Sequence, residues 1–262
     1  MTEGYRVKIF TRSFDLRLYS QASRLWEGIE CDGVVRLTDK SADGYFYSML
    51  RDEDCDIAIN IDEDAFVCNP AAVNALVRLM IDKGYANIGC ADAGEGLPRS
   101  GNPRVTNPFF NILNLRLIRT KFDRRALKAF DEHYEPYYPF FLWLADNYTT
   151  LYLPAKGHPD GTTTVLLDPE GRELCKHSWY ARFYSMPGFV VRRIQKDQGM
   201  QKGRIDALIA EVYAGRGLQR PVCGFADRCR FTADRALRWV IKVPQRISRW
   251  PSKLMRKKKK NK

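Results

Sequence analysis

Three acidic residues in a row, Asp62, Glu63 and Asp64, directly follow the apolar run at residues 57–61. Mutual repulsion makes such a cluster costly unless something positive is held there. Carboxylates two positions apart at a strand end suit a hard divalent cation such as Mg²⁺ or Mn²⁺, because these ions take oxygen ligands and keep open positions for phosphate oxygens. The turn therefore predicts a metal–diphosphate site, with an ordinary solvated acidic turn as the alternative.

Strands and helices alternate over the part of the sequence that surrounds this turn. The hydrophobic pattern predicts strands at 6–13, 33–39, 56–61 and 85–92, and helices at 20–30, 41–52 and 70–84. The last helix is the clearest, because Pro70 stands at a favoured first-turn position and Gly84 stands at its end. This alternation predicts a mostly parallel α/β sheet that is covered by helices on both faces.

Polar residues end each of the four predicted strands. These strand ends are residues 11–15, 39–43, 62–64 and 92–95. In open α/β sheets, ligands bind beyond the carboxyl ends of the strands. Four polar strand ends at one edge are hard to explain by packing alone, so we expect a binding site there.

The sequence after residue 94 is organised differently. A loop rich in Gly, Pro and Arg leads into an apolar strand at 109–118, and a helix at about 123–133 follows. Further elements are predicted at 135–147, 149–155 and 162–184, with an exposed helical or irregular cover at 190–218. We therefore divide the chain into an α/β domain at 1–189, with halves 1–115 and 116–189, a helical cover at 190–234 and a basic tail at 235–262.

The segment INIDEDAFV, residues 59–67, resembles the DxD motif of GT-A fold glycosyltransferases. Its position after three Rossmann-like strands is where that fold carries the motif. The segment 135–166 is similar to the acceptor-side helix, strand and loop of bacterial sugar transferases, and HSWYARFY at 177–184 resembles their closing strand. The resemblance to capsule or lipopolysaccharide glycosyltransferases implies a GT-A, Rossmann-like mixed sheet in three α/β/α layers.

The same resemblance implies roles for the acidic turn. Asp62 would contact the donor ribose or the metal, and Asp64 would bind the Mn²⁺ or Mg²⁺ ion that bridges the donor diphosphate. Some GT-A enzymes complete the metal shell with a late histidine, and His177 is the matching candidate; the alternative is a structural imidazole beside Trp179. Glu63 should point away and serve as a control, because consecutive strand-end residues face opposite sides.

Four further residues are candidates for contacts with the nucleotide-sugar donor. Arg12 sits where the loop after the first strand can meet the nucleotide, and Asp39 ends the second strand, where an acid commonly meets base or ribose. Arg99 and Arg104 lie in a Gly/Pro loop that could close over the diphosphate. Ordinary solvated surface charges are the alternative for these residues.

An inverting transfer also needs a general base for the acceptor hydroxyl. Inverting members of the fold carry an acid at the head of the helix after the acceptor strand, and Glu135 occupies the matching place. Asp131 and Glu132 compete with it, a helix-capping or solvated glutamate is the alternative, and Asp160 is a second candidate base. A retaining transfer needs no such base and stays open.

The positive charge of the chain is concentrated at its end. The net charge is +12, and residues 235–262 hold five Arg, seven Lys and no acid, so residues 1–234 carry 31 charges of each sign. That distribution argues against a nucleic-acid-binding surface spread over the fold. Trp239, Trp250 and seven other large apolar residues alternate with these cations, a composition that suits an anionic membrane surface and also an RNA-binding arm.

The beginning of the sequence lacks a basic-then-apolar signal pattern, and no stretch approaches the roughly 20 apolar residues of a membrane-spanning helix. We therefore expect a cytoplasmic protein that attaches peripherally to the inner face of the plasma membrane. The seven scattered cysteines, with no CxxC spacing, predict reduced thiols.

The sequence thus predicts a metal-dependent glycosyltransferase that moves a sugar from a nucleotide-diphosphate donor to a cell-surface glycan or lipid-linked acceptor. A haloacid-dehalogenase-like phosphohydrolase is one alternative. Its acid pair, however, belongs on the first strand with Thr or Val two residues later, where this chain has Phe66. A non-enzymatic membrane- or RNA-binding protein is the other alternative, and it leaves the converging strand ends unexplained.

Overall fold

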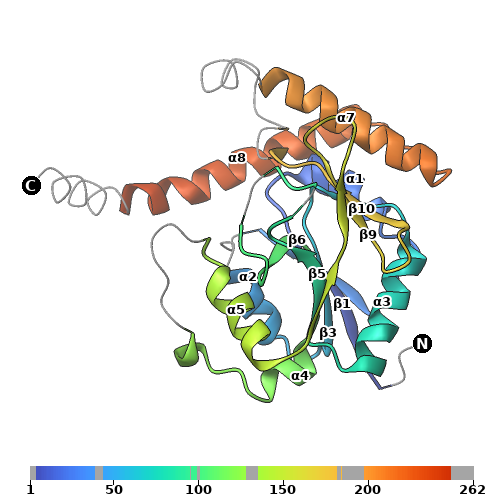
Figure 1. Ribbon diagram of the computed structural model, residues 1–262. Helices are drawn as coiled ribbons and strands as arrows, with labels where there is room; N and C mark the ends of the chain where they lie inside the picture. The colour runs from blue at the N-terminus through green and yellow to red at the C-terminus, as the bar shows by residue number, and fades with distance from the viewer. Residues whose placement is uncertain are drawn as a thin grey trace, which may run out of the picture.

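The computed structural model describes residues 4–38, 44–94, 96–98, 101–127, 135–181, 184 and 198–248 of the chain. A six-stranded sheet of order β2-β1-β3-β6-β5-β7 lies at its centre (Figure 1). Its strands are β1 (Val7–Arg12), β2 (Gly33–Leu37), β3 (Ile57–Ile61), β5 (Asn87–Ala91), β6 (Thr106–Asn114) and β7 (Thr150–Leu153). Because β6 runs antiparallel to both of its neighbours while the other pairs are parallel, the sheet is mixed.

A second sheet follows directly from the acidic turn. It has four antiparallel strands in the order β4-β10-β9-β8, namely β4 (Ala65–Val67), β8 (Ala155–Gly157), β9 (Thr164–Leu167) and β10 (Glu173–His177). Since β4 begins one residue after Asp64, the acidic turn connects the central sheet to the second sheet. The last residue of β10, His177, pairs with Ala65, which places a late part of the chain beside the turn.

Helices cover both faces of the central sheet, so the predicted three-layer α/β fold with a mixed sheet is confirmed (Figure 1). The helices are α1 (Leu16–Arg24), α2 (Gly44–Leu50), α3 (Pro70–Lys83), α4 (Leu115–Arg119), the 3₁₀ turn η1 (Arg124–Ala126), α5 (Tyr138–Asn147), α7 (Gln198–Gly215) and α8 (Phe225–Ser248). Residues of α1, α3 and α7 build one hydrophobic core, and residues of α2, α4 and α5 build the other.

Local chemistry explains where the strongest helix begins and ends. The side chain of Asn69 accepts a hydrogen bond from Ala72 N, Pro70 occupies the first turn, and Gly84 closes α3 in the left-handed conformation at φ 67°. These are the stop and start signals that the sequence pattern predicts. The acidic turn is therefore held between the buried strand β3 and the firmly capped helix α3.

Several predicted elements differ from the structure. The helix predicted at 20–30 is α1, which begins at Leu16 and ends at Arg24. The strand predicted at 109–118 ends at Asn114, whose side chain accepts from Leu117 N and so starts α4. The strand predicted at 149–155 is divided between β7 and β8. The helix predicted at about 123–133 is the turn η1 where it is described, and the rest lies outside the described residues.

The segment predicted as an exposed cover contributes to the core instead. One face of α7 is buried through Ile205, Leu208, Ile209, Val212 and Tyr213. The boundary predicted between the cover and the tail, at residue 235, falls inside α8, which continues past Pro244. Within the described residues, no helix is long and apolar enough to cross a membrane.

Candidate active site

The acidic turn is anchored by the backbone at the carboxyl end of β3. Every residue of β3 is buried, and Asp62 N donates to Phe109 O at 2.9 Å as the strand ends. Ala65 N then donates to Asp62 O at 3.0 Å, so the chain reverses within three residues. This tight reversal fixes both aspartates at the edge of the sheet where open α/β folds bind their ligands.

Asp64 and His177 are in direct contact. His177 Nε2 lies 3.3 Å from Asp64 Oδ1, and both side chains are largely buried. Ser178 N donates to Asp64 O at 3.0 Å, and the imidazole stacks on Phe109 with ring centroids 4.4 Å apart. Burial opposes ionisation of the Asp64 carboxyl, but the facing imidazole outweighs it and lowers its pKa.

Asp62 faces Arg12 instead. Its Oδ2 lies 3.4 Å from an Arg12 Nη2 nitrogen, and the guanidinium also lies 5.4 Å from the ring centroid of Tyr45. Burial raises the pKa of Asp62 to about 6, while the nearby guanidinium opposes this shift; Asp62 in turn raises the pKa of Arg12. Arg12 is therefore a candidate donor contact that the structure brings to the acidic turn.

Glu63 holds the loop that follows β1. Its carboxyl accepts from Ser13 Oγ at 2.7 Å, Phe14 N at 3.0 Å and Asp15 N at 2.9 Å. Burial raises the pKa of this carboxyl to about 8, against the pull of these three donors. The prediction that Glu63 could serve as an inert control is therefore wrong, because it fixes the loop next to Arg12.

The residues present offer a partial fit to a metal ion. In the part of the chain that the structure describes, no group of three His, Cys, Asp or Glu side chains is arranged to hold a metal ion. Asp64 and His177 touch each other, whereas Asp62 turns to Arg12. Within the same residues, Asp62 Oδ1 and His177 Nδ1 are buried and have no hydrogen-bond partner. The turn thus supplies a carboxylate and an imidazole, which are both ligands that suit divalent metals. Beside them lie two buried polar atoms without a hydrogen bond.

A left-handed turn directly follows His177. Trp179 and Tyr180 adopt φ values of 54° and 56°, a conformation that is costly for bulky residues and must be held by its surroundings. Trp179 Nε1 donates to Thr164 Oγ1 at 2.8 Å, and its ring centroid lies 4.4 Å from that of His177. Arg204 donates to the carbonyl oxygens of Ser178 and Trp179. The sequence carries no signal for this turn.

Asp92, at the end of β5, organises the neighbouring strand end. Its carboxyl accepts from Tyr138 Oη at 2.7 Å, Tyr137 Oη at 3.2 Å and Asn107 Nδ2, and the residue is 1 % exposed. A β-carbon on Gly101 would lie 2.5 Å from Asp92 Oδ2, so only glycine fits there. Sequence reasoning placed Asp92 at a strand end but gave it no role; its carboxyl ties β6, through Asn107, to Tyr137 and Tyr138 at the start of α5.

The two candidate bases have different surroundings. Glu135 lies just before α5, partly buried, and its carbonyl accepts from Tyr138 N at 3.0 Å. Asp160 accepts from Thr162 N, Thr163 N and Arg204 Nη1 at 3.0, 2.8 and 3.0 Å. Although burial opposes ionisation, these donors lower the pKa of Asp160, so this turn-forming, ion-paired carboxyl is poorly suited to take up a proton. Asp131 and Glu132 lie outside the described residues.

The structure describes only one of the remaining predicted donor contacts. Arg104 pairs with Asp146 near the end of α5. Asp39 and Arg99 lie outside the described residues. Two cavities of about 250 and 290 Å³ border α1, and none of Asp62, Asp64 and His177 lines them.

No known protein family matches the sequence, and no curated protein does. Several solved structures are similar at low identity. A197 from STIV is 15 % identical over 64 % of this chain and 93 % of its own, with a TM-score of 0.37. Mannosyltransferase PcManGT from Pyrobaculum calidifontis, solved with GDP-Man and Mn²⁺, is 11 % identical over 58 % of this chain and 56 % of its own, with a TM-score of 0.41.

TarS from S. aureus is 11 % identical over 80 % of this chain and 71 % of its own, with a TM-score of 0.40. This chain spans little more than half of the mannosyltransferase. Likeness at this level assigns no activity to this chain.

Proposed function

We propose that this protein is a metal-dependent glycosyltransferase of the GT-A type that uses a nucleotide-diphosphate sugar. The observation that carries the proposal is the contact of 3.3 Å between Asp64 and His177 at the carboxyl end of β3. Two separate parts of the chain meet there, and the cationic side chain of Arg12 stands beside them against Asp62. A solvated acidic turn would require neither the buried imidazole nor the partly buried guanidinium.

The roles of the side chains follow from their places. Asp64 and His177 would hold a Mn²⁺ or Mg²⁺ ion, with Asp62 as a further ligand or as the ribose contact. When bound, such an ion neutralises the charge that builds on the departing nucleotide diphosphate. Arg12 would orient the donor by adding a second positive charge at the same strand end.

We keep Glu135 as the candidate general base for an inverting transfer, because it precedes α5 at the sheet edge that Asp92 organises through Tyr138. Asp160 is not part of the proposal, since its oxygens are engaged by backbone groups and by Arg204. A retaining transfer would need no base, so analysis of the product anomer decides between the two outcomes.

For the acceptor, we propose a cell-surface glycan or a lipid-linked sugar at the inner face of the plasma membrane. The support is the basic, tryptophan-containing tail at 235–262, whose composition suits an anionic membrane surface. A peripheral enzyme held there would meet lipid-linked acceptors directly. A nucleic-acid partner is not part of the proposal, because the basic excess does not extend over the folded body.

Thermal denaturation with nucleotides tests this proposal. UDP, GDP and CMP nucleotides are added with and without Mn²⁺ to the full chain, to Asp64→Asn and to the control Asp54→Asn, whose carboxyl is 82 % exposed. We expect at least one nucleotide to raise the melting temperature only with Mn²⁺, in the wild type and the control but not in Asp64→Asn. If no nucleotide stabilises the wild type under any metal condition, the proposal is wrong.

A further inference from the structure

The first turns of α8 expose apolar residues to solvent. Phe225 is 84 % exposed, Leu237 is 61 % exposed, and Val222 just before the helix is 91 % exposed. Cys229 and Ala236 are exposed as well. At about 100° per residue, Phe225, Cys229 and Ala236 lie in one narrow sector of the helix, which we call the outer stripe.

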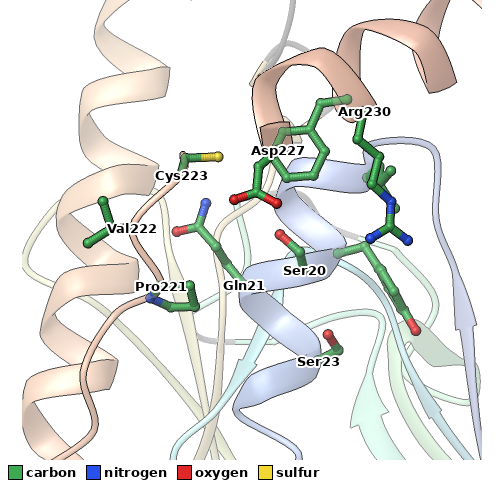
Figure 2. Close-up of a pocket in the computed structure, with 11 residues that line it drawn as sticks. Ser20, Gln21, Ser23, Pro221, Val222, Cys223, Asp227 and Arg230 are labelled. Carbon is green, nitrogen blue, oxygen red and sulfur yellow. The ribbon is translucent and has the colours of Figure 1, made fainter. Parts of the chain in front are cut away.

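The opposite side of α8 faces the body of the protein and is more polar. Asp227, Arg230 and Phe231 line a cavity of about 250 Å³ together with Ser20 and Gln21 of α1 (Figure 2). A surface helix normally turns its apolar stripe toward the core and its charges toward water. In α8 this arrangement is reversed, so the outer stripe is a surface that some partner must cover.

The outer stripe continues along the sequence of α8. Counting onward from Ala236 in helical steps gives Trp239, Val243 and Ile247, and a basic residue stands immediately before each of them. Arg228 stands before Cys229 in the same way. These pairs are Arg228–Cys229, Arg235–Ala236, Arg238–Trp239, Lys242–Val243 and Arg246–Ile247. After Asp234 the sequence holds twelve cations and no acid. The surface that covers the stripe is therefore expected to be both apolar and anionic.

We propose that the outer stripe of α8 lies in the interface of an anionic lipid bilayer, with the helix parallel to the membrane plane. A helix with an apolar stripe and basic residues along its edge binds such an interface by burying the stripe and placing the cations at the lipid phosphates. Figure 1 shows that the end of α8 extends beyond the two sheets, where a flat surface can reach it. This proposal builds on the membrane attachment proposed above for residues 235–262 and does not depend on the transfer reaction, so the flotation result and the nucleotide result can fail separately.

A second copy of the chain fits the outer stripe less well. The spacing of Phe225, Cys229, Thr232 and Ala236 is also that of a two-helix seam. In such a dimer Arg228, Arg235 and Lys242 would flank the seam, and Ala226, Ala233 and Val240 would stand at the positions that should supply acids. The cations would then face alanine and valine and find no acidic partner across the seam, whereas lipid phosphates would neutralise them.

Vesicle flotation of the full chain tests this proposal. Vesicles of phosphatidylcholine alone are compared with vesicles that also contain phosphatidylglycerol. The variant Phe225→Ser removes an apolar ring from the stripe without changing any charge or the tail. The control Val34→Ser makes the same kind of change at a side chain that is 48 % exposed on β2. Circular dichroism and melting temperature establish that each variant is folded.

The wild type should float with the anionic vesicles, and added salt should release it. Binding should fall by about tenfold in Phe225→Ser and stay unchanged in Val34→Ser. The proposal is overturned if the wild type does not float, if Phe225→Ser floats as well as the wild type, or if the wild type is a dimer that Phe225→Ser converts to a monomer.

Discussion

Replacing Arg204 with alanine should loosen the left-handed turn that follows His177. Arg204 lies on α7, its side chain is 14 % exposed, and it donates to Asp160 Oδ2 at 3.0 Å. It also donates to the backbone carbonyls of Ser178 and Trp179. One side chain therefore connects α7, the loop after β8 and the turn beside the acidic residues.

The size of the effect follows from what the alanine removes. One largely buried carboxylate loses its charged partner, and two carbonyl groups lose a charged donor. Bonds of this kind contribute roughly 1.5–3 kcal/mol each, less where water can reach the groups, so we expect the unfolding free energy to fall by about 3 kcal/mol. For a chain of this size, that loss lowers the melting temperature by about 6–12 °C.

Urea unfolding and nucleotide binding in the presence of Mn²⁺ measure the two consequences. Arg204→Lys should be intermediate, because an ammonium keeps the charge but cannot serve all three acceptors. The control Arg78→Ala removes a surface guanidinium, 3.8 Å from Glu30, and should leave both properties nearly unchanged. The reasoning is refuted if Arg204→Ala unfolds within about 0.5 kcal/mol of the wild type or if Arg78→Ala is equally damaging.

Three further predictions concern other parts of the sheet edge and α7. Gly101→Ala should destabilise the fold by roughly 1–3 kcal/mol, because its β-carbon would clash with the Asp92 carboxyl. The control Gly33→Ala places its β-carbon in open space and should leave stability nearly unchanged; urea unfolding of both variants measures the difference. Glu63→Ala should cost about 2 kcal/mol and weaken nucleotide binding by displacing the loop beside Arg12, as melting curves and titration would show. Burial opposes ionisation of Asp206, but hydrogen bonds from Lys202 and Arg220 outweigh it and lower the pKa of this carboxyl from 3.8 to about 2. The ionised carboxylate therefore stabilises the fold above pH 4. That contribution, on the order of 1–2 kcal/mol, should be lost as the pH falls from about 4 to 2, and Asp206→Asn should remove this pH dependence of unfolding.

The sequence predicts the central sheet well because its signals are local. The buried run of β3, the capped helix α3 and the polar strand ends can all be read from neighbouring residues. They predict a mostly parallel sheet with helices on both faces, whereas the mixed character of the sheet, which comes from the antiparallel strand β6, was expected only from the family resemblance. The strand predicted at 109–118 continues past the end of β6, because a single side-chain cap at Asn114 turns the chain into α4.

The candidate site was harder to predict because its contacts join distant parts of the chain. His177 reaches Asp64 through the antiparallel pairing of β10 with β4, which no local pattern shows. Asp160 looked available as a base because its partner Arg204 lies on α7, far along the chain. Glu63 looked like a control, although its carboxyl holds the loop after β1.

Turnover of sugar nucleotides tests the central claim most directly. UDP- and GDP-sugars are incubated with the full chain and Mn²⁺, and release of nucleoside diphosphate and transfer of the sugar are followed. We predict that at least one donor is consumed only with metal, and that Asp64→Asn lowers the rate by about a hundredfold or more while Asp54→Asn does not. Failure to consume any donor under all metal conditions, or an unchanged rate in Asp64→Asn, would contradict the claim.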